Sequence, residues 1–165
     1  MKKAKTALWI VILFILQASA AHYMAILGAT PILIFSFIAS IAILEDNFRY
    51  AIIVGLVCGI CAGTLLGYNF FLCVAFVSLA VVVVFFLRGK PRYMSLILKV
   101  LIWTVIISLI WEFFGIIGQF IKFGIDTEYI LVNAIIKAVY NSVITFVIYP
   151  LLRRTMYSTE KRKKI

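Results

Sequence analysis

The chain has 165 residues, of which 65% are apolar or aromatic, and its mean hydropathy is +1.17. Water-soluble domains are about 45–50% apolar, so this composition excludes a water-soluble globular domain, and it equally excludes a disordered chain. The 16 Lys and Arg residues outnumber the 6 Asp and Glu residues, and they flank long apolar runs, a pattern typical of a membrane protein rather than a nucleic-acid-binding protein.

Six apolar runs follow one another along the chain, at residues 7–21, 30–44, 50–66, 69–87, 95–120 and 129–152. A helix needs about 20 apolar residues to cross a bilayer, so the last four runs are long enough, whereas the first two are short and a re-entrant segment is an alternative for them. Thr30 and Pro31 open the second run, and proline is common in the first turn of a helix. The first run, preceded by two lysines and ended by Ala18-Ser19-Ala20, also resembles a cleavable signal peptide.

The positions of the cations predict the topology. If all six runs cross and the N-terminus is cytoplasmic, the loop cations fall on the cytoplasmic side except Lys122, and Lys99 can extend to that side from its helix. If the second run did not cross, the basic loop 88–92 would move outside. We therefore predict one all-α membrane domain over residues 1–165, with six spans and both termini cytoplasmic.

The cytoplasmic basic residues are then expected to contact anionic lipids. They lie in the loop after the fourth run and in a tail over residues 153–165: Arg88, Lys90, Arg92, Arg153, Arg154, Lys161, Arg162, Lys163 and Lys164. An acidic cytoplasmic partner is the alternative ligand of the tail. Nucleic acid is not expected, because the tail is short and has few aromatic residues for stacking.

The third run carries a glycine at every fourth position: Gly55, Gly59, Gly63 and Gly67. On a helix this spacing gives a surface without side chains, which allows a second helix to approach closely in lipid. The second helix can belong to the same bundle or to a partner protein, and the spacing does not distinguish the two.

Polar residues recur at every fourth position in the last two runs, as Thr104, Ser108 and Glu112 in the fifth and as Asn133, Lys137, Asn141 and Thr145 in the sixth. Each set lies on one helix face, and a short loop makes the two helices antiparallel. We therefore expect Glu112 to pair with Lys137 in the outer half of the bilayer, with the remaining residues forming a polar ladder. A lone charge at the centre of a membrane helix costs about 2.5–3.5 kcal/mol, and pairing two opposite charges lowers that cost. Two interpretations of the pair stay open: a structural clamp between the two helices, or part of a proton or ion relay.

Residues that would carry catalysis or bind a metal do not converge on any motif. Cys58 and Cys61 have CxxC spacing, but they lie inside an apolar run without a companion Cys or His, so small apolar packing is the interpretation. We therefore expect a non-enzymatic protein without a cofactor or metal.

Several short motifs together resemble the rod shape-determining protein MreD family. They are Leu16-Gln17-Ala18-Ser19, Thr30-Pro31, the glycines of the third run with Asn69 after them, Trp111-Glu112, Asn141, and Tyr149-Pro150-Leu151-Leu152-Arg153-Arg154. The resemblance covers nearly the whole chain, although many family members carry Asp at the position of Gly59. It implies a six-helix bundle that resembles the substrate-binding subunits of energy-coupling factor vitamin transporters.

The resemblance also implies a function and partners. It predicts a multi-pass scaffold subunit of the cell-elongation complex in the bacterial cytoplasmic (inner) membrane. There it would link a bitopic MreC-like protein, the MreB filament and the peptidoglycan synthases RodA and a class B penicillin-binding protein to maintain cell shape. The alternatives are a substrate-binding subunit of an energy-coupling factor vitamin transporter and a small proton-coupled transporter.

Overall fold

The fold is known from a computed structural model, which describes residues 2–19, 23, 29–65, 69–89, 93–123 and 127–157. Within these ranges the chain forms helices and no strand, as the all-α prediction requires. The helices are α1 (Lys2–Ser19), α2 (Leu33–Leu44), α3 (Phe48–Leu65), α4 (Phe70–Leu87), α5 (Leu96–Phe123) and α6 (Thr127–Met156).

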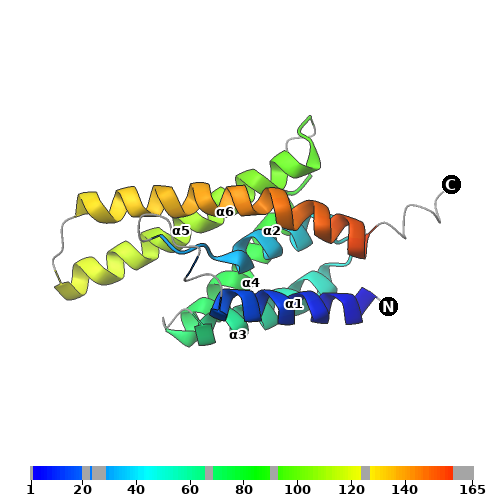
Figure 1. Cartoon of the computed structure of the whole chain (residues 1–165), viewed down its shortest axis with the longest axis horizontal. Helices are drawn as coiled ribbons and strands as arrows, with labels where there is room; N and C mark the ends of the chain where they lie inside the picture. Colours follow the sequence, from blue (N-terminus) through cyan, green and yellow to red (C-terminus); the bar gives the residue numbers. More distant parts are fainter. Residues whose placement is uncertain are drawn as a thin grey trace.

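Helix α2 lies at the centre of the bundle. It has only 12 residues, all apolar except Ser36 and Ser40, and every one except Leu44 is buried. It contacts each of the other five helices, while α3 pairs with α4 and α5 pairs with α6 as two antiparallel hairpins (Figure 1). An apolar helix of this kind, hydrophobic all round, is typical of a position enclosed by other helices.

The start of α2 differs from the prediction. The helix begins at Leu33 rather than at Thr30, and Pro31 lies in a non-helical segment before the cap residue Ile32, not in the first turn. At 1.5 Å per residue α2 is about 18 Å long, which is shorter than the hydrocarbon core of a bilayer. Non-helical backbone inside a membrane requires hydrogen-bond partners from the protein, and α2 has such partners, as described below.

Four of the described helices are long and apolar enough to cross a membrane. The qualifying segments are Phe48–Leu65, Phe70–Leu87, Leu96–Ile117 and Val132–Met156. Their outward side chains include many exposed apolar residues, among them Ile53, Leu79 and Val143. A surface of this kind is compatible with lipid and not with water, so the chain is a membrane protein.

Both terminal helices reach the same end of the bundle. Lys5 Nζ of α1 donates a hydrogen bond to the carbonyl of Thr155 in α6 (2.9 Å), and the Trp9 indole donates to the Thr155 hydroxyl (3.0 Å). The last turn of α6 continues to Met156, so Arg153 and Arg154 lie on this helix rather than in the predicted tail. We call this end, formed by the starts of α1, α3 and α5 and the ends of α2, α4 and α6, the terminal end (Figure 1).

Candidate functional site

The α5–α6 hairpin carries three polar contacts, one helical turn apart. Lys137 Nζ lies 3.0 Å from Glu112 Oε2, the Asn141 amide donates to Ser108 Oγ at 2.9 Å, and the hydroxyls of Thr104 and Thr145 lie 3.2 Å apart. These are the three pairs that the antiparallel spacing predicts. Of the predicted ladder, only Asn133 lies apart, since its Oδ1 is buried without a hydrogen-bond partner in the part of the chain described.

Helix α2 adds its own polar groups to this ladder. The backbone N–H of Ile32 donates to Asn141 Oδ1 at 2.7 Å, so the amide of Asn141 bridges α2 and α5. Ser36 donates to the carbonyl of Asn141 (3.0 Å) and accepts from the hydroxyl of Thr145 (2.9 Å). The ladder therefore joins three helices rather than the two that the sequence predicts.

Helix α1 supplies the remaining partners at the start of α2. The Gln17 side chain accepts from the N–H of Leu33 (2.8 Å) and donates to the carbonyl of Pro31 (2.9 Å). Gln17 and Asn141 together provide acceptors for two backbone N–H groups at the open end of α2. Because a helix end in lipid has no water to bind, these two side chains are what allows a short helix to begin inside the bundle.

The Glu112–Lys137 ion pair is the end rung of the ladder. It lies one helical turn from the Ser108–Asn141 rung, on the side away from Thr104 and Thr145. The side chain of Glu112 is 11% exposed and that of Lys137 is 19% exposed. In the other two rungs, each polar side chain is hydrogen-bonded to another residue of the chain. Its donors and acceptors therefore hold helices together. This arrangement favours the clamp over a relay, which would need groups free to bind a moving proton or ion.

The glycine stripe faces α4 of the same chain. A Cβ on Gly55 would lie 2.9 Å from Val81 Cγ2, and one on Gly63 would lie 2.7 Å from Phe70 Cδ2. At Gly59 the nearest atom is backbone, since the Cβ would lie 2.9 Å from the Cα of Val74. Gly55, Gly59 and Gly63 pack α3 against α4 of one bundle, so these three positions of the stripe are not open to a partner helix.

The same contact bears on the aspartate that many members of the resembled family carry at position 59. A carboxylate there would meet the backbone of α4, so α3 and α4 would have to lie further apart than they do in this chain. Gly67, the fourth residue of the stripe, lies outside the described residues.

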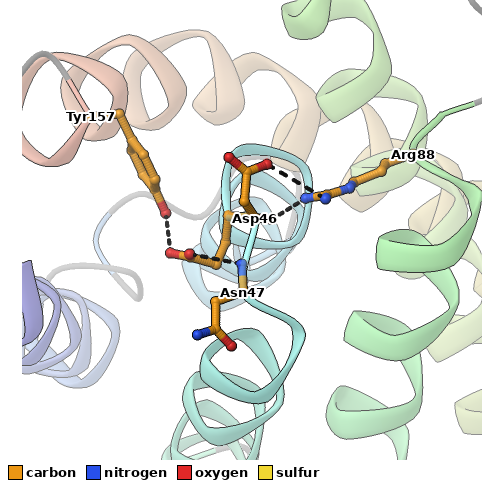
Figure 2. Close-up of polar contacts among 5 residues, drawn as sticks. Asp46, Asn47, Arg88 and Tyr157 are labelled. Carbon is orange, nitrogen blue, oxygen red and sulfur yellow. Dashed lines mark hydrogen bonds and ion pairs between the residues drawn. The ribbon is translucent and has the colours of Figure 1, made fainter. Parts of the chain in front are cut away.

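A second polar cluster lies at the terminal end, where the sequence patterns pointed to exposed cations only (Figure 2). Glu45, which follows α2, is 3% exposed, and its carboxylate accepts from the N–H of Asn47 and from the Tyr157 hydroxyl, both at 3.1 Å. Arg88 at the end of α4 donates to the carbonyl of Glu45 and pairs with Asp46 at 3.6 Å. The cluster connects the ends of α2, α4 and α6, and no helical periodicity marks it because its members come from turns.

The predicted basic residues divide between described and undescribed parts of the chain. Arg153 and Arg154 are exposed on the last turn of α6, and Arg88 is engaged in the cluster just described. The predicted contacts of Lys90, Arg92, Lys161, Arg162, Lys163 and Lys164 lie outside the described residues. Lys99 is 9% exposed, and its Nζ reaches the terminal end, where it donates to the carbonyl of Arg88 at 3.0 Å.

Comparison with known proteins gives no relative from which a role could be transferred. No family model matches the chain, and neither a curated protein nor a solved structure matches it. Within the described ranges no group of three or more His, Cys, Asp or Glu residues is placed to hold a metal ion.

Proposed function

We propose that the chain is a non-enzymatic scaffold subunit of the bacterial cell-elongation complex in the cytoplasmic membrane. The observation that carries the proposal is the buried polar ladder, whose members bind one another across α1, α2, α5 and α6. Polar groups used in this way give a bundle of defined shape rather than a reaction site. Together with the ordered motifs that resemble the MreD family, they favour a protein that acts by binding partners.

The proposed topology has six crossings with both termini in the cytoplasm. It is supported by the gathering of α1 and α6 at the terminal end and by the cations there, which include Lys5, Arg49 and Arg88. In this topology α2 crosses together with the non-helical residues 30–32 that precede it. A tag placed after Ile165 should react only when the cytoplasm is opened, and reaction of the tag from the periplasm of intact cells would contradict the topology.

The partners proposed are a bitopic MreC-like protein, the MreB filament, RodA and its class B penicillin-binding protein. The partner helix would dock on an outward apolar face, since Gly55, Gly59 and Gly63 are already covered by α4. The basic terminal end would face the filament and the anionic headgroups of the cytoplasmic leaflet.

Depletion in the source cell tests the function. Rod-shaped cells should become round when the chain is depleted, and a tagged copy should restore the rods and co-purify with an MreC-like protein. The matched control is a copy with Ser142→Ala, a change on α6 that removes only a hydroxyl bonded within its own helix and should restore rods equally well. Normal rods after depletion, together with tight binding of a vitamin, would instead support a transporter subunit.

A further inference from the structure

Helix α1 has the sequence of a cleavable signal peptide but the contacts of a bundle helix. Two lysines precede its apolar run, and Ala18-Ser19-Ala20 at its end has the small residues that signal peptidase recognises. The helix continues through Ser19, whose hydroxyl donates to the carbonyl of Ile15 at 2.6 Å. Ala20, after which the cut would fall, lies outside the described residues. Proteases cut the opened form of a segment, so Ala18 and Ser19 can be recognised only when the end of α1 unwinds.

Apolar packing alone holds α1 only weakly. Leu13 is buried, but Leu8, Val11 and Ile15 are each more than half exposed, so this helix lies at the edge of the bundle. Among the described contacts, hydrogen bonds tie both ends of α1 to other helices. The bonds to α6 hold its first turns at the terminal end, and Gln17 holds its last turn. Whether the last turn stays folded therefore depends on Gln17.

Gln17 binds a backbone segment that is made early in synthesis. Its side chain accepts from the N–H of Leu33 and donates to the carbonyl of Pro31, which follow 16 and 14 residues later in the chain. These partners are therefore present as soon as α2 has been made, before α5 and α6 exist. Because Gln17 directly precedes the motif, its docking on the start of α2 keeps Ala18 and Ser19 in the last turn of the helix.

We propose that α1 is a signal anchor whose peptidase motif is withheld by folding, so that signal peptidase cuts only those chains in which Gln17 has not docked on the start of α2. The cut would add water across the Ala20–Ala21 peptide bond, leaving a carboxylate on Ala20 and an amine on Ala21. Chains with a docked α1 keep all six helices. The proposal does not depend on the scaffold role.

A simpler explanation is that signal peptidase never recognises α1, whatever its contacts. The two explanations differ for a chain that has lost the bonds of Gln17. Such a chain stays whole if the motif is not recognised, and it is shortened if docking is what protects the motif.

The experiment expresses the full chain with a tag after Ile165 and measures the intact mass of the purified protein. One variant is Gln17→Ala, which removes both bonds to the start of α2. A second combines Gln17→Ala with Ala18→Leu, which also removes a small residue of the motif at an exposed position. The matched control is Ser19→Ala, which removes only a bond within α1 and keeps the residues of the motif small.

We expect the unsubstituted chain and Ser19→Ala to retain residues 1–20. Leaving the Leu33 N–H without its acceptor shifts the docking equilibrium about tenfold or more, so Gln17→Ala should raise the fraction of chains that begin at Ala21 by the same factor. The double variant should again be whole, because its α1 is undocked but is no longer recognised.

The proposal is overturned if the unsubstituted chain lacks residues 1–20 or if Gln17→Ala stays whole. Equal shortening of Ser19→Ala and Gln17→Ala would show that Gln17 does not protect the motif. Equal shortening of the double variant would show that another protease makes the cut. Degradation of Gln17→Ala without a product that begins at Ala21 would equally contradict the proposal, so a variant that fails to fold still decides the question.

Discussion

The two hairpins of the bundle are held together in different ways. In α3–α4 the contact is between backbones, because Gly55, Gly59 and Gly63 have no side chain to separate the helices, and no side-chain hydrogen bond joins the two helices within the described ranges. In α5–α6 the contact is polar, with an ion pair and two further hydrogen-bonded rungs. Lipid tails are as apolar as leucine, so helices in a membrane associate through close packing or through polar bonds, and this chain uses one for each hairpin.

The difference follows from what each hairpin does for α2. The α3–α4 hairpin contacts α2 and contributes apolar side chains such as Val54 and Val77 to the common core, where packing carries no specific bond. The α5–α6 hairpin instead binds the backbone at the open start of α2 through Asn141. A hydrogen bond to a given backbone N–H fixes the position of one helix along another, so the polar hairpin determines the register and the glycine hairpin determines the distance.

The largest effect is expected for Asn141→Ala. The change removes the acceptor for the N–H of Ile32 and the donor to Ser108, and it leaves a small cavity between three helices. An unsatisfied buried polar group costs about 1–3 kcal/mol, so the free energy of unfolding should fall by about 3 kcal/mol. Unfolding by SDS titration in mixed micelles measures it.

The control for this prediction is Ser142→Ala at the adjacent position. Among the described residues the Ser142 hydroxyl bonds only to the carbonyl of Ala138 in its own helix, so the change should cost less than about 0.5 kcal/mol. If the two variants are equally stable, Asn141 does not hold the start of α2, and the polar hairpin has no special role in placing that helix.

Gly59→Ala tests the glycine hairpin. The new Cβ would lie 2.9 Å from the Cα of Val74, and backbone cannot move aside as a side chain can. Overpacking destabilises a protein by about 1–3 kcal/mol, and the better helix propensity of alanine offsets up to about 1 kcal/mol of that. We therefore expect the free energy of unfolding to fall by about 1.5 kcal/mol. The same titration measures it.

Gly89→Ala is the matched control because a Cβ there meets nothing within 4 Å, and it should leave stability unchanged. A stable Gly59→Ala variant would show that α3 and α4 are not held by their close approach.

Lys137→Met breaks the ion pair of the polar hairpin. It leaves Glu112 without its partner at 3.0 Å, in a site where that side chain is 11% exposed. Polar contacts between helices in a membrane contribute about 0.6 kcal/mol on average and at most about 1.7 kcal/mol, so the free energy of unfolding should fall by about 1 kcal/mol. The double variant Lys137→Met with Glu112→Met should be more stable than Lys137→Met alone, since no charge is then left unpaired. If the double variant is the less stable of the two, the pair is not a clamp whose cost arises from an unpartnered charge.

Part of this arrangement could be predicted from the sequence, and the reason is periodicity. Residues spaced by four lie on one face, and a short loop makes α5 and α6 antiparallel, so the contacts of Glu112 and Asn141 across the hairpin follow from counting. The glycine spacing predicts a close helix contact in the same way, but it cannot identify the second helix, because glycine carries no group that specifies a partner. The six-helix, all-α architecture is likewise accessible from the apolar runs.

Contacts between a side chain and distant backbone could not be predicted. Gln17 binds the backbone beside Pro31, and Ser36 binds that of Asn141, yet neither residue stands in a repeating pattern. The late start of α2 has the same origin, because Pro31 and Ile32 lie before the helix and their backbone groups bind Gln17 of α1 and Asn141 of α6. Glu45 and Arg88 meet only because three helices end at the same level.

The smallest effect is expected for Thr104→Val, at the last rung of the ladder. Thr104 already donates to the carbonyl of Val100 in its own helix at 2.9 Å, and its hydroxyl lies 3.2 Å from that of Thr145. Thr145 keeps two further partners, Ser36 and the carbonyl of Asn141, so removing the Thr104 hydroxyl leaves no group unsatisfied. Interhelical hydrogen bonds in membranes average about 0.6 kcal/mol, and valine has nearly the same shape, so unfolding should become easier by about 0.5 kcal/mol. A loss above about 1.5 kcal/mol in the same SDS titration would mean that the rungs strengthen one another, and the ladder would then have to be treated as one cooperative network rather than as separate pairs.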